Sequence, residues 1–242
     1  MSKGILYICP TPIGNLEDIT LRTLRILKEV DLIAAEDTRR TIKLLNHYNI
    51  KKSLISYHEH NKEARGQLLI EKLNEGMSIG FVTDAGMPGI SDPGEDLIRL
   101  CIEEDIKVIV LPGPTASITA LVNSGLPTGK FVFEGFFPSK RKERIKELER
   151  LKGEKRTMII YEAPHRLLSL LKDIYEVLGD RRIAISRELT KIYEETFRGC
   201  VSEGIKKFEF QEPKGEFVLI LEGAKIEEGD LFSDISIKEH IE

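Results

Sequence analysis

Short apolar runs rich in isoleucine and valine alternate along the chain with longer segments in which apolar residues recur every three or four positions. The runs are typical of buried strands and the longer segments of amphipathic helices, so the alternation predicts βα units around a largely parallel sheet. Asp18 or Thr20 is available to cap the first helix. In the first half, strands are predicted at 5–9, 32–35, 54–57, 79–83 and 108–111, and helices at 20–29, 38–47, 63–75 and 95–104.

The second half shows the same strand signal with different spacing. The last three strands are separated by links with turn character, which predicts that part of this sheet is antiparallel. Strands are predicted at 131–133, 157–161, 183–186, 194–198 and 217–221, and helices at 140–152 and 166–178.

A proline- and glycine-rich stretch at 111–115, followed by a helical segment at 116–125, marks the predicted domain boundary. The chain is therefore predicted to form a first α/β domain over residues 1–113 with a mainly parallel sheet. A second α/β domain with a mixed sheet is predicted over 114–224. Residues 225–242 are polar and lack a clear period, so we expect a loosely held tail.

The segment 79–94 is an apolar run that ends abruptly in turn residues. Gly86, Gly89 and Gly94 permit backbone shapes closed to other residues, and two prolines stiffen the loop. Such a loop at the carboxyl end of a strand is where an open α/β sheet binds a small ligand. The alternative is a tight strand-to-helix connection that binds nothing.

Similar loops follow other predicted strands. Those at 10–15, 36–39 and 112–116 should emerge on the same sheet edge as 84–94. The second domain adds polar segments after strands at 161–166 and 187–191. We therefore expect a cleft between two domains that binds a substrate.

Composition and motifs narrow the function classes. The chain is 41% apolar and 31% charged and has no long uncharged apolar run, so we expect a cytoplasmic globular protein. Its three cysteines are widely spaced, which favours reduced thiols. Nucleotide-binding P-loops, dinucleotide fingerprints and hydrolase elbows are missing from the sequence. His58 and His60 would point to opposite sides of an extended segment, so no metal site is predicted.

The charge is unevenly distributed along the chain. Residues 139–156 contain nine lysines or arginines and four glutamates, a local net charge of +5 against −4 for the whole chain. A basic helix of this kind either contacts RNA phosphates or is a solvated surface helix with glutamate–lysine pairs.

Taken together, several motifs resemble the ribosomal RNA small subunit methyltransferase I family, whose members have the two-domain tetrapyrrole methylase fold. The match runs from about residue 4 to residue 223 with the motifs in order. They are CPTPIGNLED at 9–18, AEDTR at 35–39, TDAGMPGISDPG at 83–94, PGPTA at 112–116, EGFFP at 134–138, YEAPHR at 161–166, RELTK at 187–191 and GEFVL at 215–219.

The resemblance implies a homodimer that binds S-adenosylmethionine and methylates the ribose 2'-hydroxyl of a cytidine in the decoding region of 16S ribosomal RNA. The RNA contacts that we expect are four residues of the basic segment, chosen for their charge, and an arginine of the second motif: Lys140, Arg141, Lys142, Arg144 and Arg39. Implied cofactor contacts are Pro12, Asp84, Ala85, Gly86, Met87, Ile90, Ser91, Thr115, Ala116, Glu162 and Leu189.

A ribose hydroxyl is a poor nucleophile until its proton is removed, so a general base is expected. Asp37 and Glu188 are the favoured candidates, ahead of His165 and Lys191. For both carboxylates the alternative is an ion pair with the neighbouring arginine, Arg39 or Arg187.

Two other functions stay open at this stage. One is methylation of a small tetrapyrrole, which the loop sequence PTPIGN disfavours because that branch typically carries a Gly-x-Gly-Pro-Gly-Asp loop. The other is a non-catalytic, RNA-binding ribosome assembly factor. Family members commonly carry a longer basic C-terminal extension, so we expect RNA binding here to depend more on residues 139–156.

Overall fold

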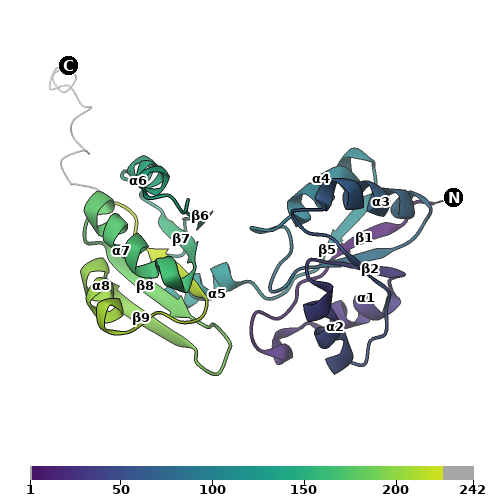
Figure 1. Ribbon diagram of the computed structural model, residues 1–242, viewed down its shortest axis with the longest axis horizontal. Helices are drawn as coiled ribbons and strands as arrows, with labels where there is room; N and C mark the ends of the chain where they lie inside the picture. Colours follow the sequence, from purple (N-terminus) through teal and green to yellow (C-terminus); the bar gives the residue numbers. More distant parts are fainter. Residues whose placement is uncertain (1, 226–242) are drawn as a thin grey trace, which may run out of the picture. The chain divides into compact units, whose positions relative to one another are not determined.

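The computed structural model describes residues 2–225, and their contacts group into two compact units (Figure 1). Unit 1 contains the chain up to Thr119 together with Leu189–Ile192, and unit 2 contains Ala120–Glu188 and the chain from Tyr193. Apart from Lys225, the predicted tail at 225–242 lies outside the described residues. No helix among the described residues is long and apolar enough to span a membrane.

Unit 1 is built on a five-stranded sheet in which all neighbouring strands are parallel, as predicted. The strand order is β3-β2-β4-β1-β5. The strands are β1 (Ile5–Ile8), β2 (Leu32–Ala35), β3 (Leu54–Ser56), β4 (Ile79–Val82) and β5 (Lys107–Val110).

Helices cover both faces of this sheet (Figure 1). On one face α1 and α2 pack over a core that includes Ile33 and Val82, and on the other α3 and α4 pack over Leu6 and Phe81. The hydroxyl of Thr20 accepts a hydrogen bond from the Thr23 N–H and caps α1. The helical segments of unit 1 are η1 (Leu16–Asp18), α1 (Leu21–Glu29), α2 (Thr38–His47), α3 (Lys62–Asn74) and α4 (Gly94–Glu103). The next helix, α5 (Ala116–Ser124), begins in unit 1 and continues into unit 2.

The strand order indicates the edge at which unit 1 is expected to bind a ligand. The chain leaves β1 through α1 on one face and leaves β4 through α4 on the other, although β1 and β4 are neighbours. Connections that diverge from adjacent strands open a crevice at their carboxyl ends, which is where α/β sheets bind ligands.

Unit 2 has a mixed sheet, which confirms the prediction for the second half. Its strand order is β6-β7-β10-β8-β9; β6 and β7 are parallel, and the other pairs are antiparallel. The strands are β6 (Phe131–Phe136), β7 (Thr157–Glu162), β8 (Arg182–Arg187), β9 (Glu195–Cys200) and β10 (Phe217–Leu221).

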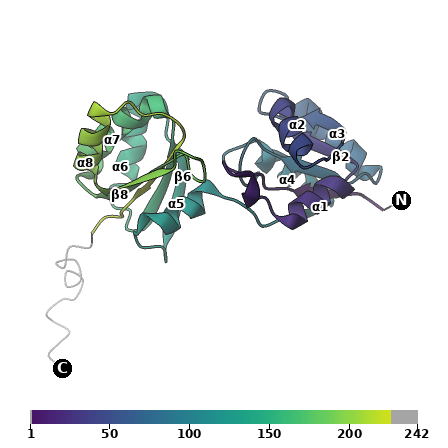
Figure 2. The same ribbon diagram turned by 90° about the horizontal axis from the view of Figure 1, so that it is seen from below.

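Three helices, α6 (Arg141–Arg150), α7 (Pro164–Leu178) and α8 (Val201–Phe210), lie on one face of this sheet (Figure 2). The prediction of turn-like links between the last three strands is wrong for the second link, because α8 lies there. Val201, Gly204 and Phe208 bury one side of α8. Its short length and central glycine weaken the helical signal in the sequence, so burial of this stripe stabilises the helix.

Candidate functional site

The loops that follow β1 and β4 are joined into one structure at the edge of the unit 1 sheet. The N–H of Thr11 donates to the Gly86 carbonyl and the Gly86 N–H donates to the Thr11 carbonyl, both at 3.0 Å. The Thr11 hydroxyl also donates to the Thr83 carbonyl at 3.2 Å. Two loops from distant parts of the sequence are therefore held together at the point where the strand connections diverge.

One carboxylate organises the loop between β4 and α4. The Asp92 carboxylate accepts hydrogen bonds from the N–H groups of Gly89, Ile90 and Gly94, at 2.7 to 3.2 Å. Gly89 and Ser91 have positive φ angles of 89° and 62°. Positive φ is rare for serine, so the loop carries backbone strain there that these hydrogen bonds hold in place.

The loop after β5 packs equally closely on the loop after β1. A methyl group added at Gly113 would come within 2.5 Å of the Pro10 side chain. Close approach of this kind requires glycine, so the PGP sequence after β5 fixes the distance between the two loops.

A segment from the second half of the chain completes this edge. Leu189 is buried, and residues 189–192 group with unit 1. The Thr190 hydroxyl accepts a hydrogen bond from the Asn15 N–H at 3.0 Å, and a methyl group added at Gly14 would lie 2.8 Å from the Leu189 carbonyl oxygen.

The polar groups at this edge come from the ends of β2 and β4. Asp84 pairs with Arg40 of α2, with Oδ2 3.0 Å from the guanidinium, while its Oδ1 is buried and accepts no hydrogen bond. The Thr83 hydroxyl is likewise buried without a partner. Burial raises the pKa of Asp84 and that of Glu36, whose carboxylate accepts a hydrogen bond from the Asp84 N–H at 3.3 Å.

Most of the cofactor-binding residues implied by the resemblance lie at this edge. Met87 packs partly against the core, whereas Ile90 is exposed. The residues of this set that belong to unit 1 are Pro12, Asp84, Ala85, Gly86, Met87, Ile90, Ser91, Thr115, Ala116 and Leu189.

Glu162 is the member of the set that belongs to unit 2. It ends β7 and is 2% exposed, with one oxygen accepting a hydrogen bond from the Ala163 N–H at 2.8 Å and lying 3.1 Å from the Arg166 guanidinium. Its second oxygen has no hydrogen-bond partner, and burial raises its pKa.

The two candidate bases have different surroundings. Asp37 caps α2 by accepting a hydrogen bond from the Arg39 N–H at 2.8 Å, and it also pairs with the Arg39 guanidinium. These bonds lower the Asp37 pKa to about 2. Glu188 of unit 2 has φ 52°, and its carboxylate accepts a hydrogen bond from the Glu216 N–H at 2.9 Å.

The predicted RNA-contacting residues on α6 separate into buried and exposed side chains. The Arg144 side chain is 5% exposed, and its guanidinium pairs with the buried Asp173 of α7 at 2.5 Å. Burial and this ion pair argue against the expectation that Arg144 contacts RNA, because folding commits this charge to the core. Arg141 is exposed but also pairs with Asp173 and with Glu176.

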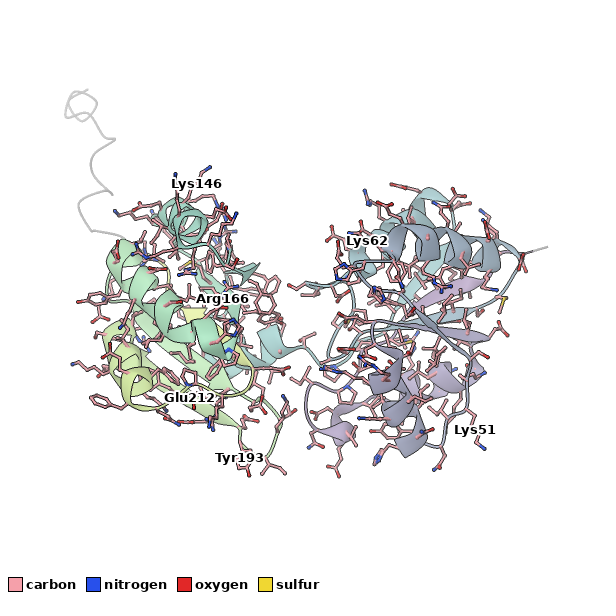
Figure 3. The ribbon with its side chains drawn as sticks, viewed as in Figure 1. Lys51, Lys62, Lys146, Arg166, Tyr193 and Glu212 are labelled. Atoms are coloured by element: carbon pink, nitrogen blue, oxygen red, sulfur yellow. The ribbon has the colours of Figure 1, made fainter. Side chains whose placement is uncertain are left out.

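Lys142 and Lys146 lie one turn apart on α6, are exposed, and form no ion pair within the described part of the chain. Figure 3 labels Lys146 on this helix. Lys140 lies 3.4 Å from Glu143, and Arg39 is exposed beside Asp37. The sequence prediction did not include Lys146, because it selected the first turn of α6. A spacing of four residues from Lys142 is the signal that places both on one side of the helix.

Comparison with known proteins extends these observations. Residues 5–203 match the family of Tetrapyrrole (Corrin/Porphyrin) Methylases. A protein of Halalkalibacterium halodurans named ribosomal RNA small subunit methyltransferase I is 52% identical, with 99% of this chain and 84% of that protein covered. The protein of the same name from Thermotoga maritima is also 52% identical, with 91% of this chain and 99% of that protein covered.

Solved structures share the fold at low identity. A diphthine synthase superposes with a TM-score of 0.69 at 12% identity, covering 93% of this chain and 92% of its own. Uroporphyrin-III C-methyltransferase of Thermus thermophilus, complexed with S-adenosyl homocysteine, superposes with a TM-score of 0.63 at 17% identity. That alignment covers 90% of this chain and 97% of the Thermus chain.

Proposed function

Because the chain belongs to the ribosomal RNA small subunit methyltransferase I family, it is an S-adenosylmethionine-dependent methyltransferase of ribosomal RNA, and we propose that its acceptor is a cytidine 2'-hydroxyl in the decoding region of 16S RNA. Identity of about half over nearly the whole chain is the observation that carries this proposal. The edge of unit 1 supplies the physical basis for cofactor binding.

The groups at this edge fit S-adenosylmethionine. Its hydroxyl and ammonium groups are hydrogen-bond donors, and the buried Oδ1 of Asp84 is an acceptor without a donor in the described chain. Its carboxylate needs N–H donors, which helix N-termini provide, and α4 and α5 begin at this edge at Gly94 and Ala116. We propose that the loops after β1, β4 and β5, with Leu189, hold the cofactor.

When bound, the cofactor supplies an electrophilic methyl group on a sulfonium sulfur. The main task of the protein is then to hold the acceptor oxygen in line with that group, and orientation alone contributes strongly to such reactions. The hydrogen bonds of Asp92 and the paired backbones of Thr11 and Gly86 fix the loops before any ligand arrives. This rigidity reduces the conformational entropy lost when the ligand binds.

Removal of the hydroxyl proton calls for a carboxylate with a pKa nearer neutrality than that of Asp37. A pKa of about 2 makes Asp37 a weak base, and its contacts suit the capping of α2 and the positioning of Arg39. Of the two candidate residues we therefore propose Glu188 as the one to test first for proton removal.

For RNA binding we propose that Lys142, Lys146, Lys140 and Arg39 contact phosphates. All four side chains are exposed, and the first two form no ion pair within residues 2–225. Arg141 stays a weaker candidate because two carboxylates already accept its hydrogen bonds. We further propose that the active protein is a homodimer in the cytoplasm.

Transfer of labelled methyl from S-adenosylmethionine tests the proposal. The acceptors are small ribosomal subunits lacking native modification, naked 16S RNA and uroporphyrinogen, with nuclease mapping of the labelled RNA. We expect label in a 2'-O-methylcytidine of the decoding region. Label in uroporphyrinogen alone would move the protein to the small-molecule branch, and cofactor binding without transfer to any acceptor would favour an assembly factor.

A further inference from the structure

Glu36 is a half-buried carboxylate at the edge of unit 1 that the mechanism above does not use. It directly follows β2, and its N–H donates to the Val82 carbonyl at 3.3 Å, which continues the pairing of β2 with β4. The 3.3 Å hydrogen bond from the Asp84 N–H is long for a charged acceptor. Within residues 2–225 the Glu36 carboxylate forms no ion pair.

The register of β2 and β4 places Thr83 opposite Glu36, one residue beyond the paired Ala35 and Val82. Ala35 and Val82 are partners in the parallel register and belong to the same core cluster, so the next residues along, Glu36 and Thr83, point to the opposite face of the sheet. Thr83 is 4% exposed, and its hydroxyl oxygen has no partner. A buried hydroxyl without a partner is costly unless a ligand supplies one.

The charges around Glu36 are mostly negative. Burial raises the Glu36 pKa, and so do Asp84 and Asp92 from the loop after β4. Arg40 from α2 lowers it. The Asp92 carboxylate already accepts hydrogen bonds from three N–H groups of its loop, whereas Glu36 retains free acceptor capacity. This part of the edge therefore attracts positive charge.

We propose that Glu36, with Thr83 opposite it, forms an acidic subsite for the sulfonium of S-adenosylmethionine and makes the protein bind the cofactor more tightly than its product. The inference rests on the proposed function. Methyl transfer converts the cationic sulfonium into the neutral thioether of S-adenosylhomocysteine. A carboxylate that favours the cation loses this attraction after transfer, so the subsite promotes exchange of the product for new cofactor.

Binding measurements without RNA test this inference. Isothermal titration calorimetry on the full chain would compare S-adenosylmethionine, S-adenosylhomocysteine and sinefungin, in which a protonated amine replaces the sulfonium centre. In Glu36→Gln we expect affinity for the two cationic ligands to fall about tenfold, as for loss of one partly screened charge pair. Affinity for S-adenosylhomocysteine should change less than twofold.

Glu63→Gln is the matched control, because it removes the same charge from an exposed position on α3. It should alter none of the three affinities. Glu36→Gln keeps an oxygen that can accept from the Asp84 N–H and removes a charge that burial and two carboxylates disfavour, so the melting temperature should not fall. Equal loss of affinity for all three ligands would overturn the inference, since Glu36 would then contact a part that they share.

The pH dependence of ligand affinity provides an independent test of the Glu36 subsite. Because its pKa is raised, Glu36 becomes protonated at a higher pH than an ordinary glutamate does. The preference for the cationic ligands over S-adenosylhomocysteine should therefore decline on acidification. Glu36→Gln should show no such decline. A wild-type protein that binds cofactor with the same pH profile as the variant contradicts the subsite, whereas a wild-type protein that binds none of the ligands contradicts the proposed function.

Discussion

At the scale of single residues, the loop after β4 takes its shape from two positions, Asp92 and Gly94. Asp92 gathers the N–H groups of Gly89, Ile90 and Gly94 around one carboxylate. Gly94 has no room for a side chain, because an added methyl group would lie 2.5 Å from the Phe81 ring and 2.8 Å from the Gly89 nitrogen. The shape of the loop is thus set by a hydrogen-bond acceptor and by the absence of a side chain.

Gly94→Ala should therefore lower the free energy of unfolding by about 1 to 3 kcal/mol, the range for overpacking in a close-packed site. It should also weaken S-adenosylmethionine binding, because the loop must shift away from Phe81. Chemical denaturation and calorimetry would measure the two effects. Gly129→Ala is the control, since nothing lies within 4 Å of its added methyl group, and it should leave both quantities nearly unchanged. A Gly94→Ala variant with unchanged stability and unchanged cofactor affinity would contradict the prediction, because the loop would then accommodate the added methyl group.

Asp37 leads to a prediction on pH. Its pKa falls from the ordinary 3.8 to about 2 through hydrogen bonds with Arg39. A lowered pKa means that its contribution to stability is complete above 3.8 and is lost as the pH falls through about 2. The difference in melting temperature between wild type and Asp37→Asn should be constant near neutral pH and shrink in strong acid. If the wild-type rate instead rises with pH along an acidic limb that is missing in Asp37→Asn, Asp37 is the general base.

At the scale of elements, α6 combines a structural side and a solvent side. Arg144 pairs with Asp173, both nearly inaccessible to solvent, and this ion pair fastens α6 to α7. Arg150 reaches Glu134 on β6 at 3.0 Å and ties the other end of the helix to the sheet. Lys142 and Lys146 are exposed and remain available to a ligand. Removing a positive charge from the structural side should therefore lower stability, whereas removing one from the solvent side should lower RNA affinity.

Arg144→Met should lower the free energy of unfolding by about 3 kcal/mol, because it leaves a buried carboxylate without its main partner. Lys142→Gln with Lys146→Gln should leave stability unchanged. The lysine variant should instead weaken RNA binding and reduce the slope of log affinity against log salt by about 0.7 for each phosphate that is no longer neutralised. Denaturation curves and salt titrations with the decoding-region RNA would separate the two. A normal salt slope in the double lysine variant would exclude this side of α6 as an RNA-binding surface.

At the scale of the whole molecule, the family and the cofactor lead to a prediction about ligand stabilisation. A ligand that binds only the folded protein stabilises it by about 2.7 kcal/mol at a concentration about one hundred times its Kd. S-adenosylmethionine should therefore raise the melting temperature by several degrees, whereas uroporphyrinogen should not. Differential scanning calorimetry measures both. Stabilisation by uroporphyrinogen would favour the small tetrapyrrole as substrate.

The alternation of apolar runs and amphipathic segments was enough to predict the elements of unit 1. Strand 32–35 and helix 38–47 match the structure residue for residue, and Thr20 caps α1 as one of two expected candidates. Parallel strands buried on both faces have continuous apolar runs that stand out in a sequence. The helix α8 did not stand out, because it is short and contains a glycine, and its stability comes from packing.

The sequence by itself determined the family, the mainly parallel and mixed sheets and the loops that carry the glycines and prolines, since these follow from local patterns and motif order. Only the tertiary structure decided which charges are available, because pairing depends on residues far apart in the chain. Arg144 is committed to Asp173 of another helix, Asp37 to a cap, and Asp92 to its loop. Glu36 and Thr83 become neighbours only through the register of two strands separated by more than forty residues, so no local pattern could join them.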